Sequence, residues 1–175
     1  TAQQEGIPLQ KFLTLFIPPL LERKDPKDPQ RLRKELGLDP DALVVGVVSR
    51  LIPDKGHRYL IDAAKEILSR FPKVYFLIVG WGHAEGELRA QIEKLGVSER
   101  VKLTGRMDIQ DVLPLFDIYA EPAVSTDLPV ALMEAMREGK PIVATNIGDI
   151  PVFIEDKKTG LIVEPGNAQQ LTERI

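Results

Sequence analysis

The chain has 175 residues, of which 43% are hydrophobic and 28% charged, and its formal net charge is −3. This length suits one well-buried domain, and the interspersed acids and bases exclude a broad electrostatic surface for nucleic acid or an anionic membrane. The sequence contains no cysteine, which excludes disulfides, thiolate catalysis and cysteine metal sites and fits a reducing compartment. No apolar run reaches the roughly 20 residues that a membrane-spanning helix needs, so we expect a cytoplasmic protein.

The first 36 residues differ from the rest in pattern. Residues 24–30 are charged and contain two prolines, and Gln30–Leu36 then has helix-like composition with a glycine as its stop. We therefore expect an interdomain segment with a lead-in helix over residues 1–36 and a folded domain over residues 37–175.

From residue 37 onward, strand-like and helix-like segments alternate. Short β-branched runs of the buried-strand type predict strands at Val44–Val48, Val74–Val79, Val101–Thr104, Ile118–Ala120, Ile142–Ala144 and Leu161–Val163. The segments between them predict helices at Arg58–Arg70, Ala84–Leu95, Ile109–Phe116 and Val130–Arg137, and a further helix after Asn167. This βαβ series predicts an α/β domain with a parallel sheet of about six strands and helices on both faces.

Two cations, Arg50 and Lys55, follow the first predicted strand. In a doubly wound sheet the loops after the carboxyl ends of the strands line the ligand crevice. Far along the chain, a polar turn runs into an apolar helix at Leu128, and a helix N-terminus is a natural phosphate-binding element. We therefore expect Arg50 and Lys55 to face the same ligand as the start of that helix.

Six motifs follow one another in a fixed order. They are Ser49–Gly56, Phe76–Gly82, Val101–Arg106, Leu128–Met136, Gly139–Thr145 and Thr159–Gly166. On these motifs, the chain from about Gly37 to Ile175 resembles the C-terminal, nucleotide-binding domain of retaining nucleotide-sugar glycosyltransferases with two Rossmann-like domains. This group 1 family includes sucrose, glycogen and mannosyl transferases. The resemblance implies a Rossmann-like fold, the C-terminal half of a GT-B architecture, and a nucleoside-diphosphate sugar as donor substrate.

The resemblance also implies roles for the loops after the first and third strands. In such enzymes the matching cations hold the donor diphosphate, so Arg50 and Lys55 would stabilise the negative charge that develops on the leaving group. The residues Gly105, Arg106 and Met107 would hold the nucleotide base through their main chain.

Further roles are implied for the helix at Val130–Arg137. Glu134 would hydrogen bond the donor ribose hydroxyls, where the alternative is a solvated glutamate that the helix dipole favours. The backbone amides of Leu128 and Val130 would bind the distal phosphate, while Pro129 has no amide to offer.

One departure from the family pattern affects the transferred sugar. The family usually has glutamate followed by glycine eight residues before Glu134, where this chain has Thr126 and Asp127. A threonine donates a hydrogen bond but cannot act as a general base. For Asp127 three interpretations stay open: the carboxylate turns away from the phosphate, it lowers phosphate affinity, or it contacts a sugar hydroxyl in place of the missing glutamate.

No cofactor and no metal are expected. The two cations and the helix terminus can neutralise the diphosphate, and His57 and His83 lack carboxylate partners at ligand spacing. We interpret both histidines as polar loop residues.

The hypothesis that follows is a donor-binding domain for transfer with retention of configuration to a saccharide or lipid-linked acceptor. Because Thr1 is not an initiator methionine, we expect the chain to be a fragment of a longer protein. An N-terminal domain outside this chain would bind that acceptor and provide any peripheral membrane contact. The isolated chain is then expected to bind nucleotide without turnover. Two alternatives stay open: a non-catalytic nucleotide-binding or interaction module, which Thr126 and Asp127 motivate, and a nucleotide-sugar epimerase of the same architecture.

Overall fold

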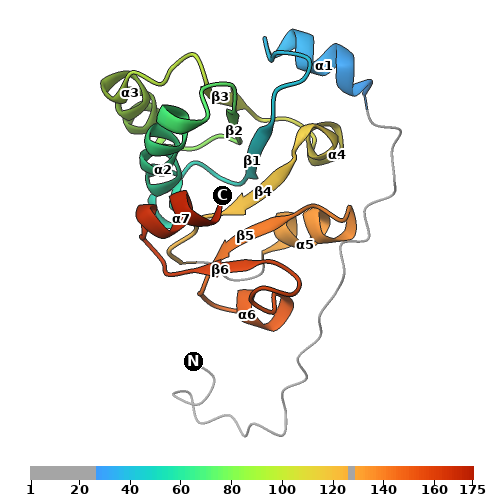
Figure 1. The fold of residues 1–175 in the computed structure, drawn as a ribbon, viewed down its shortest axis with the longest axis vertical. Helices are drawn as coiled ribbons and strands as arrows, with labels where there is room; N and C mark the ends of the chain where they lie inside the picture. The colour runs from blue at the N-terminus through green and yellow to red at the C-terminus, as the bar shows by residue number, and fades with distance from the viewer. Residues whose placement is uncertain (1–26, 126–128) are drawn as a thin grey trace, which may run out of the picture.

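The computed structural model describes residues 27–125 and 129–175, which contain one six-stranded sheet in the order β3-β2-β1-β4-β5-β6 (Figure 1). The strands are β1 (Val44–Val48), β2 (Tyr75–Val79), β3 (Val101–Gly105), β4 (Ile118–Glu121), β5 (Ile142–Thr145) and β6 (Leu161–Val163). Every neighbouring pair is parallel, so the carboxyl ends of all six strands lie at one edge. The strand order reverses between β1 and β4, which is where open α/β sheets form their ligand crevice.

Helices cover both faces of the sheet (Figure 1). They are α1 (Pro29–Glu35), α2 (His57–Arg70), α3 (Glu85–Leu95), α4 (Ile109–Val112), α5 (Val130–Arg137), α6 (Ile150–Phe153) and α7 (Ala168–Arg174), with short 3-10 turns η2 (Pro53–Lys55) and η3 (Leu113–Leu115). One core joins α2, α3 and α7 to the strand residues that include Val45 and Val47. The other joins α1, α4, α5 and α6 to the alternate residues that include Val44. Because successive strand side chains point to opposite faces, β1 contributes to both cores.

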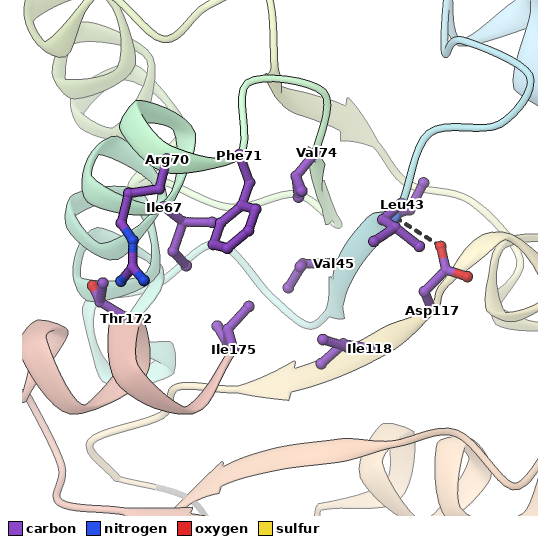
Figure 2. A pocket seen from close by; sticks show the side chains of 11 residues that line it. Leu43, Val45, Ile67, Arg70, Phe71, Val74, Asp117, Ile118, Thr172 and Ile175 are labelled. Carbon is purple, nitrogen blue, oxygen red and sulfur yellow. Dashed lines mark hydrogen bonds between the residues drawn. The ribbon is translucent and has the colours of Figure 1, made fainter.

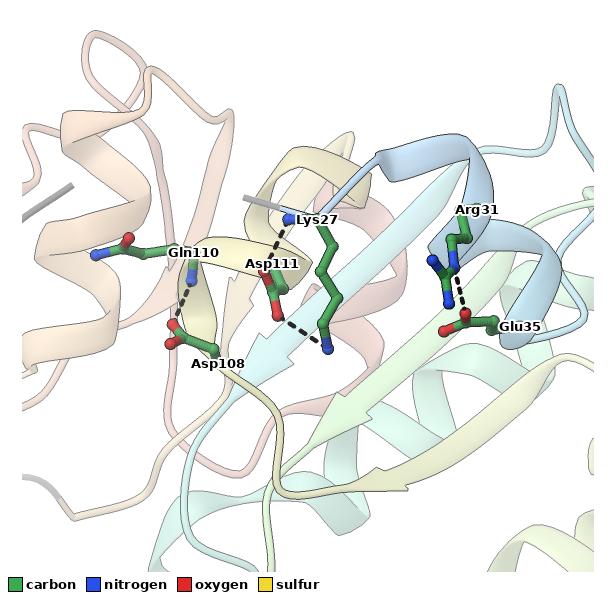
Figure 3. A network of polar contacts seen from close by, with 6 residues as sticks. All are labelled: Lys27, Arg31, Glu35, Asp108, Gln110 and Asp111. Atoms are coloured by element: carbon green, nitrogen blue, oxygen red, sulfur yellow. Dashed lines mark hydrogen bonds and ion pairs between the residues drawn. The ribbon is translucent and has the colours of Figure 1, made fainter. Parts of the chain in front are cut away.

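Lys27, just before α1, attaches this part of the chain to helix α4. The Lys27 backbone nitrogen donates to Asp111 Oδ1 at 2.9 Å. The side-chain ammonium of Lys27 lies 3.3 Å from Asp111 Oδ2 (Figure 3). Leu32 of α1 is buried in the second core. In the same network Asp108 caps α4 by accepting from the Gln110 backbone nitrogen at 3.1 Å. Helix α1 therefore packs on the domain beside α4.

The predicted parallel sheet of six strands is confirmed, and the predicted strands and most helices agree with the structure to within one residue at each end. The single helix predicted over Ile109–Phe116 is wrong, because α4 ends at Val112 and η3 follows it. Pro114 has no amide proton to continue the α-helical hydrogen bonds. The four-residue helix α6 was not predicted, since so short a segment shows no helical periodicity.

Strand β1, at the centre of the sheet, allows a test of how tightly the core is packed. A Cβ atom at Gly46 of β1 would lie 2.3 Å from the Phe116 ring, which is itself buried. We predict that Gly46→Ala lowers the free energy of unfolding by about 1–3 kcal/mol, because overpacking forces neighbours off their rotamers. Urea denaturation followed by circular dichroism measures this.

Gly86→Ala is the matched control. Nothing lies within 4 Å of a Cβ at that position in α3, so alanine should raise stability by about 0.5–1 kcal/mol through helix propensity. Equal effects of the two substitutions would contradict the packing described for β1.

Candidate functional site

The loop after β1 carries both predicted phosphate-binding cations. Arg50 is exposed, and its guanidinium forms no hydrogen bond or ion pair with the residues that the structure describes. Lys55 is partly buried and ends the 3-10 turn η2. Gly56 follows with φ +66°, a conformation that lets the chain turn directly into α2. The loop thus presents one cation to solvent and holds the other against the protein.

Turn η2 rests on the chain segment that follows β4. The backbone nitrogens of Val124 and Ser125 donate to the Asp54 carbonyl at 2.8 and 3.2 Å. A Cβ atom at Gly56 would lie 1.9 Å from the Pro122 carbonyl oxygen, so the two backbones are in direct contact. This contact joins the Lys55 loop to the segment that leads toward α5.

The chain at the end of β2 and just after it forms backbone hydrogen bonds with the loop that carries Arg50. The Leu51 backbone nitrogen donates to the Trp81 carbonyl at 2.9 Å, and the Ser49 nitrogen donates to the Val79 carbonyl at 3.0 Å. Gly80 has φ +148°, and a Cβ there would lie 1.8 Å from the Ser49 carbonyl oxygen. The backbone around Arg50 is therefore fixed by main-chain contacts on two sides.

The predicted base-binding loop lies at the same edge of the sheet. The Gly80 nitrogen donates to the Gly105 carbonyl at 2.9 Å, which places the end of β3 beside the loop after β2. Arg106 is exposed, whereas Met107 is partly buried against the second core.

Glu134 lies inside α5 and is only 3% exposed. Its Oε1 has no hydrogen-bond partner among the described residues. Burial raises the pKa of this carboxyl, the charge of Arg137 opposes that rise, and the charge of Asp108 adds to it. The solvated glutamate weighed in the sequence analysis is thus wrong, because the Glu134 side chain is buried.

The remaining predicted donor residues lie at or just before the start of α5. Val130 is its first residue and is 44% exposed, directly after Pro129. Thr126, Asp127 and Leu128 lie outside the described residues, so their predicted contacts stay predictions.

His57 differs from its prediction. It is the first residue of α2, is 2% exposed, and its Nε2 lies 2.9 Å from Ser49 Oγ. Burial and the charge of Lys55 lower the pKa of His57 to about 4, so the ring is neutral at pH 7. The interpretation as a polar loop residue is wrong for His57, because the residue begins helix α2 and its side chain is buried. His83, in contrast, is exposed in a turn as predicted.

Sequence reasoning missed Glu121 at the end of β4. The side chain is 3% exposed, Tyr119 Oη donates to its Oε2 at 3.3 Å, and Oε1 has no partner among the described residues. Burial raises the pKa of Glu121 to about 7, against the opposing effects of the Lys55 charge and the Tyr119 hydrogen bond. The one available signal was a carboxylate that ends an apolar strand directly before Pro122.

Burial, then the charges of Glu121 and Glu134, raise the pKa of the Tyr119 phenol. The Tyr119 hydroxyl therefore lies in the field of both buried carboxylates, which connects the Lys55 side of the edge to the α5 side.

A separate apolar groove lies at the other end of the strands (Figure 2). Leu43 and Phe71 are 59% and 55% exposed on its rim, and Ile118 and Ile175 line it. Asp117 Oδ2 accepts from the Val44 backbone nitrogen at 2.8 Å at the start of β1. This groove belongs to the amino ends of β1 and β4, away from Arg50 and Lys55.

Residues 27–125 and 129–175 contain neither a cluster of metal-binding side chains nor a membrane-spanning helix. No group of three or more His, Asp or Glu side chains is arranged to hold a metal ion. None of the helices there has the length and apolar character to cross a bilayer.

Comparison with known protein families identifies the family of this chain. The model of the family described as glycosyl transferases group 1 matches residues 28–175. The chain belongs to this family. Among curated relatives, the group 1 domain is 31% identical over 147 residues to an alpha-D-kanosaminyltransferase of Streptomyces kanamyceticus, covering 82% of this chain and 38% of the relative. It is 34% identical over 160 residues to a GDP-mannose-dependent phosphatidylinositol monomannoside mannosyltransferase of Corynebacterium glutamicum, covering 86% of this chain and 41% of the relative.

Solved structures give the same fold. Anabaena HepE in complex with UDP and glucose superposes with a TM-score of 0.77 at 32% identity, covering 86% of this group 1 domain and 42% of HepE. The C-terminal domain of the group 1 protein LpcC from Francisella tularensis has a TM-score of 0.71 at 20% identity, covering 84% of this chain and 80% of that domain. The predicted Rossmann-like fold, the C-terminal half of a GT-B architecture, is confirmed. The chain spans about two fifths of the length of the curated relatives named above.

Two of the buried titratable groups at this edge, His57 and Glu121, should give opposite pH dependences of stability. His57 has a pKa of about 4 when folded against an ordinary 6.5, so the unfolded chain binds more protons and stability falls as pH drops through that window. Glu121 has a pKa of about 7 against 4.5, so its contribution is present below pH 4.5 and is lost as pH rises through 7.

Glu121→Gln removes only the second term. As pH falls from 7.5 to 5, the unfolding free energy of the wild type should therefore gain about 2 kcal/mol relative to that variant. His57→Asn should shift the comparison in the opposite direction. Urea denaturation at several pH values measures both, and a difference that does not change with pH would contradict these burial assignments.

Proposed function

We propose that this chain is the donor-binding half of an enzyme that transfers a sugar from a nucleoside diphosphate to an acceptor with retention of configuration. The observation that carries the proposal is the backbone contact between the Lys55 loop and the segment after β4. It joins the turn that carries Lys55 to the segment after β4, at the edge where the strand order reverses, which supports a ligand site there.

Arg50 and Lys55 would act on the leaving group. When the bond between the sugar and the diphosphate breaks, negative charge grows on the departing phosphate oxygens, and fixed cations stabilise that charge in the transition state. The main-chain contacts around Ser49–Gly56 hold the cations in place before the donor binds. Arg50 offers a planar fork of donors, and Lys55 offers a point charge.

The nucleoside would lie between α5 and the loop after β3. Glu134 is buried in α5 with one unpartnered oxygen, and the charge of Asp108 reaches it from the start of α4. We infer that Glu134 accepts hydrogen bonds from the ribose hydroxyls and that the main chain of Gly105, Arg106 and Met107 binds the base.

The distal phosphate would lie at the start of α5. The first amides of a helix have no acceptor within it, so the Val130 amide is suited to an anion. The proposal assigns the Leu128 amide to the same phosphate and Thr126 and Asp127 to the sugar. It includes no metal, because these amides and the two cations supply the compensating charge.

The relatives guide the choice of nucleotide and reaction. HepE was solved with UDP and glucose, and separately with UDP-glucose, whereas the Corynebacterium relative is named as GDP-mannose-dependent. UDP is therefore the first nucleotide to test, beside GDP and ADP. The relatives are named as transferases, which supports transfer over epimerisation.

The whole reaction would need a second domain. Since the chain spans only about two fifths of its relatives, we infer that another domain binds a saccharide or lipid-linked acceptor. The isolated chain would bind nucleotide without turnover, because one wall of the cleft would be missing. The proposal places the protein in the cytoplasm, which the absence of cysteine supports. Detectable transfer by the isolated chain would contradict this part of the proposal, and a full-length protein that binds donor without transfer would favour the interaction-module alternative.

Calorimetric titration with UDP, GDP and ADP tests the donor site. One of the three nucleotides should bind, and Arg50→Ala or Lys55→Ala should each weaken that binding by about 1.5–3 kcal/mol, as for a charge-assisted contact. Lys94→Ala is the matched control, since Lys94 lies exposed in the last turn of α3 and should leave affinity unchanged. Absence of binding by all three nucleotides would overturn the proposal.

A deoxynucleotide tests the role of Glu134. If UDP is the nucleotide, the wild type should bind it more tightly than 2′-deoxy-UDP by about 1–3 kcal/mol, because a buried acceptor loses its partner. Glu134→Ala should bind both nucleotides equally, and Glu93→Ala, an exposed position in α3, should keep the preference. A preference retained by Glu134→Ala would remove this residue from the ribose site.

A further inference from the structure

A hydrogen bond between two side chains joins the two ends of the loop that carries the phosphate-binding cations. Ser49 directly precedes Arg50 in the sequence. His57 follows Lys55 by two positions and is the first residue of α2. Ser49 Oγ lies 2.9 Å from His57 Nε2, within hydrogen-bond distance. The proposed function assigns no role to either side chain.

One nitrogen of the His57 ring has no hydrogen-bond partner. The side chain is 2% exposed, and Nδ1 is buried without a donor or acceptor among the described residues. Burial, and then the charge of Lys55, lower the pKa of His57 to about 4, so at pH 7 the ring is neutral and carries a proton on only one nitrogen. The two possible tautomers assign opposite roles to the Ser49 hydroxyl.

The unpartnered nitrogen favours one of these tautomers. With the proton on Nδ1, a buried N–H group would have no acceptor, and in proteins such N–H groups are rarer than buried acceptors without a donor. With the proton on Nε2, the N–H group donates to Ser49 Oγ at 2.9 Å, and Nδ1 keeps only an unused lone pair. The structure therefore favours the Nε2 tautomer.

In this tautomer the Ser49 hydroxyl is left with its own proton to donate. A hydroxyl has one donor hydrogen, and Ser49 is partly exposed directly after β1. Helix α2 begins at the residue that contacts this hydroxyl and has no side-chain cap at Gly56. The positive end of α2 therefore lies near Ser49, in the same loop as the two cations, and favours an anion there.

We propose that the Ser49 hydroxyl donates a hydrogen bond to a phosphate oxygen of the nucleoside-diphosphate donor, and that His57 is a positioning residue that orients this hydroxyl by donating to it from Nε2. The inference rests on the proposed function, since it needs a diphosphate at the loop after β1. A hydrogen bond to a charged phosphate oxygen is stronger than one between neutral groups. No covalent bond changes.

The arrangement orients the hydroxyl before the donor binds. The Ser49 backbone is fixed by its hydrogen bond to the Val79 carbonyl and by the close approach of Gly80 to its own carbonyl. His57 then restrains the side chain on that fixed backbone. Less conformational entropy is lost when a ligand meets a side chain that is already ordered.

The tautomer of His57 gives a first test, which needs no ligand. Nitrogen-15 correlation spectra of the labelled chain at pH 7 show which ring nitrogen carries the proton, because Nε2 couples strongly to both carbon-bound ring protons and Nδ1 to only one. The sequence has two histidines, so His83→Gln leaves only the signals of His57. The inference predicts the proton on Nε2. A proton on Nδ1 would overturn it, because Ser49 would then donate to the ring.

Calorimetric titration with UDP gives a second test. Ser49→Ala should lower the affinity about tenfold or more, because a hydrogen bond to a charged group is lost. Ser49→Thr keeps a hydroxyl and should stay within about threefold of the wild type. Ser69→Ala is the matched control, since the exposed Ser69 hydroxyl donates to the Glu66 carbonyl near the far end of α2. Equal affinities of the wild type and Ser49→Ala would contradict the phosphate contact.

Two substitutions of His57 separate orientation of the hydroxyl from packing. A glutamine amide can donate to Ser49 from about the position of Nε2, whereas leucine fills a similar volume without a donor. His57→Gln should therefore bind UDP within about threefold of the wild type, and His57→Leu should lose about as much affinity as Ser49→Ala. Equal losses in both variants would assign His57 to packing alone. If neither variant folds, the tautomer and the Ser49 variants still decide the inference.

The outcomes separate this inference from the proposed function. If Arg50→Ala and Lys55→Ala weaken UDP binding but Ser49→Ala does not, the donor site stands and only the role of Ser49 fails. If UDP, GDP and ADP all fail to bind, the proposed function fails and the inference falls with it.

Discussion

The candidate site depends on one constraint, the direct contact of backbones at the carboxyl edge of the sheet. Gly56 meets the Pro122 carbonyl and Gly80 meets the Ser49 carbonyl, at separations that no side chain would permit. Main-chain hydrogen bonds to the carbonyl oxygens of Asp54 and Trp81 stabilise the same contacts. These interactions fix the backbone of the loop that carries Arg50 and Lys55 without using either charged side chain. A larger residue at Gly56 or Gly80 would clash with the Pro122 or Ser49 carbonyl and so displace the backbone of this loop.

The electrostatic character of the site follows from that geometry. Burial, and then the charge of Lys55, lower the pKa of the neighbouring His57 to about 4, while burial raises the pKa of Glu121 to about 7 against the Lys55 charge. Arg50, one loop residue beyond the fixed backbone of Ser49, faces solvent. The two cations are therefore not equivalent, because Lys55 is partly buried whereas Arg50 is exposed and its charge is screened by solvent and salt. A diphosphate that bridges the two cations would contact a partly buried charge at Lys55 and an exposed, more adaptable charge at Arg50.

Much of the fold could be predicted from the sequence because its signals are local. Strands such as Val44–Val48 are short β-branched runs, and buried parallel strands require that composition. The extended helix predicted at Ile109–Phe116 was wrong because Pro114 interrupts it without breaking the apolar pattern. The burial of His57 could not be predicted, since it depends on how the chain around η2 packs on a segment more than sixty residues away. A single sequence does not report such contacts, whereas the six ordered motifs did indicate the family.

The central claim is that the diphosphate binds where the loops after β1 and β4 meet. Backbone amide chemical shifts of the isotopically labelled chain, recorded with and without UDP, test this most directly. The account predicts shifts concentrated at Ser49–Gly56, Gly105–Met107 and the first turn of α5, with the groove around Leu43 and Phe71 unaffected. Shifts confined to that groove, at the amino ends of the strands, would contradict it.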